Sequence, residues 1–133
     1  GAQWPQRLAQ HKALAATASY RAGQQWLNDH PVEQASCYQY FKEALIVWSF
    51  AQSQAWFRDH GVRINCVAPG PVWTPLIPAT MPDEAVKNFG SGYPMGRPGQ
   101  PVEVAPVYVL LGSDEASYIS GARYAVTGGK PVL

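Results

Sequence analysis

The stretch "DHGVRINCVAPG", residues 59–70, constrains the fold more than any other. A long helical pattern ends at its start, and Gly61 suits the left-handed residue that commonly follows a helix. Residues 62–70 then form a short β-branched run that ends in Pro-Gly, which predicts a buried strand leading into a loop. Helix, tight turn and strand in this order indicate an α/β fold with a parallel sheet.

The first 60 residues contain few of the 12 prolines and 12 glycines and are predicted to be helical. Helices are expected over about 5–16, over 19–29 with Ser19 as a cap, and over 36–60. The third helix is apolar around much more than one stripe, so burial on two sides is expected. Its apolar residues are Tyr40, Phe41, Ala44, Leu45, Val47, Trp48, Phe50, Ala51, Ala55, Trp56 and Phe57.

The remainder is richer in proline and glycine and is predicted to alternate loop, helix and strand. Residues 71–100 read as a long loop with one helical turn near 82–88, and long loops in compact domains are usually functional or disordered. A helix is predicted over 101–111 and a second buried strand over 122–129. The apolar face of that helix is expected to comprise Val104, Val107, Tyr108 and Leu111.

Composition excludes several classes of function. At 133 residues and 47% hydrophobic, the chain can form one compact domain with a core. A net charge of +1 with 14% charged residues argues against nucleic acid and anionic membranes as partners. No segment approaches the length of a membrane span and no basic, then apolar, leader begins the sequence, so a soluble cytoplasmic protein is expected.

Cysteine and histidine spacing does not predict a metal site. Cys37 and Cys66 are far apart and match no ligand motif, which favours buried free thiols in a reducing compartment. His11, His30 and His60 also lack ligand spacing, so structural or solvated histidines are favoured.

Tyr38 and Lys42 are four positions apart, which places both side chains on one helical face. A free tyrosine has a pKa of about 10, and a lysine cation one turn away favours the phenolate form, so such a pair can exchange protons. Alone the pattern is weak, because about 0.2 chance occurrences are expected in this composition. The alternative interpretation is a surface pair on an amphipathic helix.

Four segments in order make the motif specific: Tyr38-x-x-x-Lys42, "GVRINCVAPGPVWTPL", "PMGRPGQPVEVAPVYVLLGSDEASYISG" and "VTGG". Together they resemble the C-terminal half of the short-chain dehydrogenase/reductase family over residues 36–129. The resemblance implies the C-terminal half of a doubly wound Rossmann-type parallel sheet over 35–133, with 1–34 as a helical insertion. Within the family the sequence is most similar to bacterial 3α-hydroxysteroid and coniferyl-alcohol dehydrogenases.

The resemblance implies an NAD- or NADP-dependent oxidoreductase acting on an alcohol or ketone, with a steroid or aryl alcohol as one possible substrate. Tyr38 would be the catalytic acid or base, and Lys42 would also hold the ribose hydroxyls of the coenzyme. The expected cofactor-binding residues are Lys42, Pro69, Gly70, Val72 and Thr74. For Val72 and Thr74, simple loop packing is the alternative interpretation.

The family's glycine-rich coenzyme fingerprint and catalytic serine have no counterpart in these residues. "GSGYPMG", residues 90–96, follows no predicted strand and contains Pro94, so it is interpreted as a loop. The chain is therefore expected to be a fragment of a dehydrogenase about twice this length and inactive alone. An alternative function is a dimerising, structural remnant; in either case the family resemblance implies a homodimer or homotetramer formed through helix 36–60.

Overall fold

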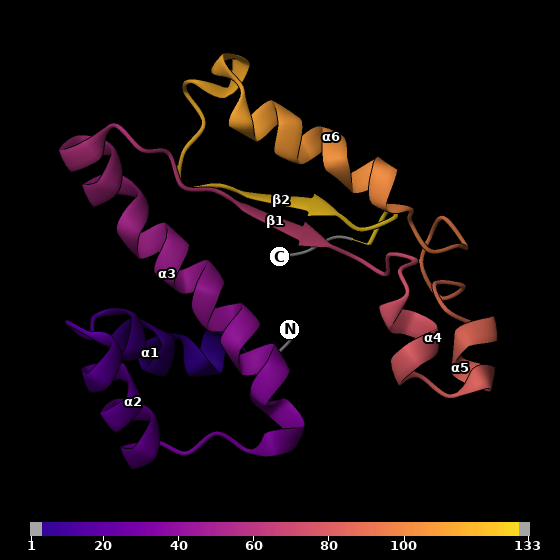
Figure 1. Cartoon of the computed structure of the whole chain (residues 1–133), viewed down its shortest axis with the longest axis horizontal. Helices are drawn as coiled ribbons and strands as arrows, with labels where there is room; N and C mark the ends of the chain where they lie inside the picture. Colours follow the sequence, from indigo (N-terminus) through magenta and orange to yellow (C-terminus); the bar gives the residue numbers. More distant parts are fainter. Residues whose placement is uncertain (1–3, 131–133) are drawn as a thin grey trace. The chain divides into compact units, whose positions relative to one another are not determined.

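The computed structural model describes residues 4–130 and divides into two compact units, with the boundary between Ile64 and Asn65. Figure 1 shows the helices of the first unit and the strands and helices of the second. The long helix of residues 37–60 packs with the N-terminal segment, so both belong to the first unit. The assignment of 1–34 as an insertion and 35–133 as family domain concerns ancestry and stays a prediction.

All regular elements in the described part of the first unit are helices, as the sequence predicts. Ser19 accepts a hydrogen bond from the Ala22 N–H at 3.2 Å and so caps the second helix. Gly61 has φ of +67°, the left-handed conformation expected after the third helix. The elements are α1 Trp4–Ala15, α2 Tyr20–Asp29, the 3₁₀ turn η1 Gln34–Ser36 and α3 Cys37–His60.

Helices α1 and α3 are joined by a buried polar cluster rather than by apolar contacts alone. His11 on α1 is fully buried, and its Nε2 donates to Glu43 Oε2 on α3 at 3.2 Å. Arg7 lies 3.7 Å from the same carboxylate oxygen, and the His11 ring meets the edge of Tyr40 at 4.5 Å between centroids. Burial raises the pKa of the Tyr40 hydroxyl.

Buried residues occur on two sides of α3, which confirms that expectation. Tyr40 and Val47 face one side, and at 3.6 residues per turn Ser49 and Ser53 fall on roughly the opposite side. The second side buries serines rather than aromatics, and each serine hydroxyl donates to a carbonyl of its own helix. Exposed apolar residues remain at Phe41, Leu45, Trp48, Phe50, Trp56 and Phe57.

The second unit is built on two parallel strands, which confirms the α/β class. Strand β1, Cys66–Pro69, pairs with β2, Arg123–Val126, with Cys66 opposite Arg123. Helix α6, Pro101–Gly112, packs against β1 and connects to β2 through the 3₁₀ turn η2, Asp114–Ala116 (Figure 1). The loop before α6 contains two short helices, α4 Leu76–Thr80 and α5 Asp83–Lys87.

Both strands are shorter than predicted: β2 ends before Gly128 and Gly129, which both have positive φ, and β1 begins late because the Asn65 side chain occupies the groups that would pair before it. Asn65 Nδ2 donates to the Ile119 carbonyl at 2.8 Å, and Asn65 Oδ1 accepts from the Ala122 N–H at 3.1 Å. The Cys66 N–H, at the start of β1, donates to the Ala122 carbonyl at 2.9 Å. The predicted turn near 82–88 is confirmed by α5, whereas α4 was not predicted.

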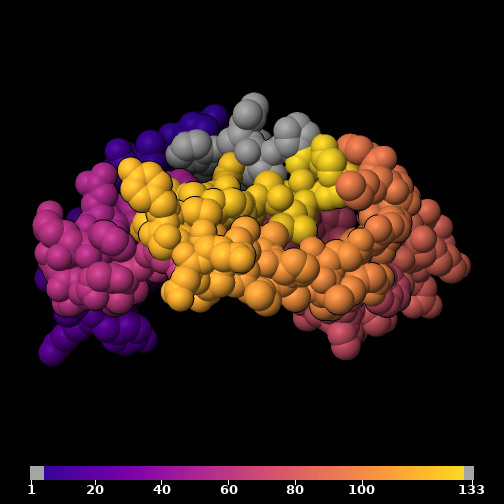
Figure 2. Space-filling model, turned by 90° about the horizontal axis from the view of Figure 1, so that it is seen from above, coloured from indigo at the N-terminus to yellow at the C-terminus, as the bar shows by residue number. Residues whose placement is uncertain are grey.

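Two packing predictions are wrong. Tyr108 was assigned to the buried face of α6 but is 57% exposed, because this helix is apolar around its circumference and buries only a narrow seam centred on Val104. Figure 2 shows α6, in orange, forming part of the molecular surface. Cys37 and Cys66 are free but half-buried rather than buried. No helix within the described residues is long and apolar enough to cross a membrane.

Candidate functional site

The structure brings Tyr38 and Lys42 together in the first turns of α3. The Lys42 Nζ lies 5.5 Å from the centroid of the Tyr38 ring, within the range of a cation–π contact. Both side chains lie on the side of α3 roughly opposite Tyr40 and Val47, so helix α1 does not cover them. Tyr38 is 75% exposed, which leaves its hydroxyl accessible to a small molecule.

Tyr40, two positions further on, shows why the position on the helix matters. Its ring is 3% exposed and packed against His11 and beneath the Arg7 guanidinium, whose carbon lies 5.7 Å from the ring centroid. A substrate cannot reach a hydroxyl in that environment. Of the two tyrosines, only Tyr38 therefore has the accessibility and the neighbouring cation that proton exchange requires.

The predicted cofactor residues of the second unit lie on the segment that leaves the carboxyl end of β1. Pro69 ends the strand, and the Gly70 N–H continues the pairing by donating to the Val126 carbonyl at 2.8 Å. A Cβ at Gly70 would lie 2.9 Å from the Thr127 Cα, so the two backbones approach too closely for any other residue without a shift. Glycine is thus required here by the neighbouring strand.

Val72 is held by an isolated parallel bridge to Gly99. The Trp73 N–H donates to the Gly99 carbonyl at 2.8 Å, and the Gly99 N–H donates to the Pro71 carbonyl at 2.9 Å. A parallel bridge of this kind uses the groups on either side of Val72, so the N–H and C=O of Val72 itself point the other way. These two groups form no hydrogen bond within the described residues and can bind a ligand.

Thr74 is half-buried at the end of this segment. Its carbonyl accepts from the Ile77 N–H at the start of α4, while its hydroxyl has no partner among residues 4–130. Loop packing therefore accounts for the Thr74 backbone but leaves the hydroxyl available. The structure places Pro69, Gly70, Val72 and Thr74 along one short segment, as the sequence predicts, and their contact with a cofactor stays a prediction.

A cavity of about 540 Å³ lies beside this segment, at the carboxyl ends of the two strands. Ligands of open α/β sheets bind beyond these strand ends. Val72 lines the cavity, whereas Tyr38, Lys42, Pro69, Gly70 and Thr74 do not. The other lining residues are Pro71, Met95, Arg97, Gly99, Glu103, Val104, Ala125, Val126, Thr127, Gly128, Gly129 and Lys130.

Sequence reasoning missed the ion pair at the cavity wall. Arg97 donates two parallel hydrogen bonds of 2.8 Å to Glu103, and the Gln100 N–H donates to the same carboxylate at 2.8 Å. The Arg97 hydrogen bonds, followed by that of Gln100, lower the pKa of Glu103 to about 2. A signal was present: Glu103 occupies the third position of a helix that begins with proline, where a carboxylate caps backbone N–H groups.

The described residues contain no group of three or more histidine, cysteine, aspartate or glutamate side chains arranged to hold a metal ion. His11 is instead part of the polar cluster between α1 and α3, and His30 is on the surface with its Nδ1 2.9 Å from the Trp26 carbonyl.

Comparison with known proteins identifies the family of the chain. The family model described as enoyl-(acyl carrier protein) reductase matches residues 3–130. The chain belongs to the short-chain dehydrogenase/reductase family. It is 44% identical over 135 residues to a coniferyl-alcohol dehydrogenase from a Pseudomonas species, covering 97% of this chain and 51% of that protein.

Two further proteins match part of this chain. An NADPH-dependent aldehyde reductase from Arabidopsis thaliana is 53% identical over 75 residues, which are 56% of this chain and 26% of that protein. The crystal structure of a 3-oxoacyl-(acyl-carrier protein) reductase from Brucella melitensis superimposes with a TM-score of 0.61 and 32% identity, over 72% of this chain and 35% of the other. The chain spans about half the length, or less, of the relatives it matches.

Proposed function

We propose that this chain supplies the proton-transfer residues and part of the coenzyme site of an NAD- or NADP-dependent alcohol dehydrogenase or ketone reductase. The observation that carries the proposal is the Tyr38–Lys42 pair, an accessible phenol with an ammonium group 5.5 Å from its ring. Membership of the oxidoreductase family supports the reaction class, and the arrangement of the pair supports the choice of residues.

In this proposal Tyr38 exchanges a proton with the substrate oxygen, and the Lys42 cation stabilises the phenolate form that appears during the exchange. The bound coenzyme accepts or supplies the hydride. Lys42 also holds the ribose hydroxyls, for which its exposed ammonium group offers three donors. Each role is chemically consistent with the exposure of the two side chains.

The segment after β1 fits the nicotinamide end of such a coenzyme. A carboxamide has one acceptor and two donor hydrogens, and Val72 offers an N–H and a C=O on the side away from Gly99. The Thr74 hydroxyl adds a further polar group, while Pro69 and Gly70 place the backbone beside the strand end. These residues of the second unit would hold the coenzyme, and Tyr38 would exchange the proton.

The names of two relatives support an alcohol or carbonyl compound as the substrate. One relative is named for coniferyl alcohol, an aryl alcohol, and another for NADPH-dependent reduction of aldehydes. We therefore propose an alcohol or carbonyl substrate, with aryl alcohols to be tested first. Both coenzymes, NAD and NADP, are to be tested.

Tyr38→Phe tests the proposal in the natural full-length protein. Removal of the hydroxyl is expected to lower turnover by about 10²- to 10⁴-fold, the usual contribution of a positioned acid or base. Coenzyme affinity is expected to change little, because the ring and Lys42 both remain. Turnover of an aryl alcohol and fluorescence titration with NADH and NADPH are the measurements.

Tyr118→Phe is the matched control, since Tyr118 is fully exposed and lies outside the proposed site. Unchanged turnover of Tyr38→Phe would refute the proposed role. If the 133-residue chain by itself reduced a ketone with NADH, the alternative of a structural remnant would be excluded.

We also propose that α3 mediates self-association. Phe41, Leu45, Phe50 and Phe57 are exposed along this helix, an apolar surface that a second copy of the protein can cover. Sedimentation of the full-length protein over a range of concentrations is expected to show a dimer or tetramer, and Phe57→Ser is expected to shift it toward monomer. A strictly monomeric wild-type protein would contradict this.

A further inference from the structure

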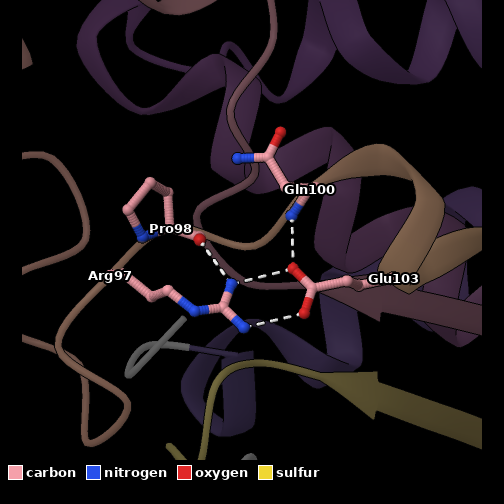
Figure 3. Close-up of polar contacts among 4 residues, drawn as sticks. All are labelled: Arg97, Pro98, Gln100 and Glu103. Carbon is pink, nitrogen blue, oxygen red and sulfur yellow. Dashed lines mark hydrogen bonds and ion pairs between the residues drawn. The ribbon is translucent and has the colours of Figure 1, made fainter.

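The Arg97–Glu103 pair contacts the two residues that flank Gly99, the bridge partner of Val72. Figure 3 shows the Arg97 guanidinium facing the Glu103 carboxylate, with hydrogen bonds from Arg97 Nη1 to Oε2 and from Nη2 to Oε1, both 2.8 Å. Nη1 also donates to the Pro98 carbonyl at 3.0 Å, and the Gln100 N–H donates to Oε2 at 2.8 Å. The pair therefore fixes the backbone on both sides of Gly99.

Gly99 is the residue that holds Val72 in place. Its C=O accepts from Trp73 and its N–H donates to Pro71, so the orientation of the Gly99 peptide groups determines how this part of the 71–73 segment is turned. No side chain of Gly99 can contribute to that orientation. The hydrogen bonds of its neighbours Pro98 and Gln100 must supply it.

A second contact, between Gly90 and Pro98, restricts the backbone next to Gly99. Gly90 has φ of +84° and approaches so closely that a Cβ there would lie 2.4 Å from the Pro98 nitrogen. The backbone at Gly90 is thus packed against Pro98, while Arg97 donates a hydrogen bond to the Pro98 carbonyl. Gly99 has little freedom to rotate as long as both contacts persist.

We propose that Arg97 and Glu103 are positioning residues for the coenzyme: the ion pair orients Gly99, and Gly99 orients the N–H and C=O of Val72 toward the carboxamide. This inference rests on the proposed function, in which Val72 binds that carboxamide. It adds to the function two residues that do not touch the substrate and act through the backbone.

The exposure of the pair separates this role from simple stabilisation of the fold. Arg97 is 53% and Glu103 43% exposed, and an ion pair so open to water contributes little to overall stability. A capping role for Glu103 alone predicts a small loss of stability and no selective effect on the coenzyme. A positioning role predicts a selective loss of the hydrogen bonds that Val72 makes.

The experiment compares coenzymes with and without the carboxamide amine in the full-length protein. NADH and NADPH are titrated beside their 3-acetylpyridine analogues, in which a methyl group replaces the amine. Arg97→Met removes the guanidinium, and Glu103→Gln keeps an oxygen for the Gln100 N–H while removing the charge. Arg58→Gln is the control, because it removes an exposed arginine that pairs only with its neighbour Asp59 among the described residues.

The dissociation constant of the natural coenzyme is expected to rise about 3- to 10-fold in both site variants, the value of one hydrogen bond. The dissociation constant of the acetylpyridine analogue is expected to rise by a smaller factor, because the analogue can still accept from the Val72 N–H but cannot donate to the Val72 carbonyl. Arg58→Gln should leave both unchanged. Equal losses for the two coenzymes, or no loss, would overturn the inference.

Hydrogen exchange of the coenzyme-free protein gives a second measurement. The Trp73 and Gly99 amides are expected to exchange about 3- to 10-fold faster in Arg97→Met and Glu103→Gln than in the wild type. If the wild type binds neither coenzyme, the proposed function fails, while the exchange rates still decide whether the pair orients this segment. If Arg97→Met does not fold, Glu103→Gln decides both measurements.

Discussion

One charged contact in each unit of the molecule has a structural role, and the two contacts differ in burial. Between α1 and α3, His11 and Glu43 are buried and their contact joins two helices, while the Tyr38–Lys42 pair lies exposed on the far side of α3. In the second unit the ion pair is exposed and ties one loop to the helix that follows it. The buried contact thus holds two helices together, whereas the exposed Arg97–Glu103 pair orients a nearby backbone segment.

The difference has an energetic consequence. Removing one partner of a buried pair leaves the other charge without compensation and costs about 3–5 kcal/mol. Exposed pairs contribute about 0–1 kcal/mol because water screens them. The free energy of unfolding should therefore be sensitive to the cluster between α1 and α3. In the second unit, substitutions should lower it mainly at positions where two backbones are in close contact.

The largest effect is expected for Glu43→Ala. This change removes the carboxylate that contacts both Arg7 and His11, and it should lower the free energy of unfolding by about 3–5 kcal/mol. Urea denaturation followed by circular dichroism measures it. Glu33→Ala, an exposed glutamate preceding α3, is the control and should cost less than about 0.5 kcal/mol.

A loss below about 1 kcal/mol for Glu43→Ala would remove the distinction between the two units. It would mean that water reaches the cluster and screens the pair as it does on the surface.

An intermediate effect is expected for Gly70→Ala, which tests the close approach of backbones in the second unit. The added Cβ would lie 2.9 Å from the Thr127 Cα, so the strand end must shift, at a cost of about 1–3 kcal/mol. Gly92→Ala is the matched control, since a Cβ there meets nothing within 4 Å. Thermal denaturation measures the melting temperatures of both variants. Equal values would show that the end of the strand can shift to accommodate the added Cβ at no cost in stability.

Helix boundaries could be predicted from the sequence because each depends on a few neighbouring residues. Ser19 caps α2 and Gly61 ends α3 through local hydrogen bonds and backbone conformation. The positions of Tyr38 and Lys42 on one face follow from the helical repeat alone. The family motifs added their proposed chemistry, which periodicity could not supply.

Contacts between distant positions could not be predicted in the same way. Asn65 binds groups 54 and 57 positions away, and its side chain sets where β1 begins. His11 gives no local sign that it pairs with Glu43, 32 positions later. Helix α4 escaped prediction because Pro75 and Pro78 suggested a loop, although proline is tolerated in the first turn of a helix.

The smallest effect is expected for the pH dependence contributed by Glu103. Its pKa is lowered to about 2 in the folded protein, below the value of about 4.3 of a free glutamate, so the ionised carboxylate favours the fold. This stabilisation is present above about pH 4.3 and is lost as the pH falls through about 2. Glu103→Gln should remove that part of the acid sensitivity, seen as a shallower fall in melting temperature between pH 5 and 2. Because the pair is open to water, the change should be smaller than that of Gly70→Ala, and an equal or larger change would show that this exposed pair holds the second unit together as the buried cluster holds the first.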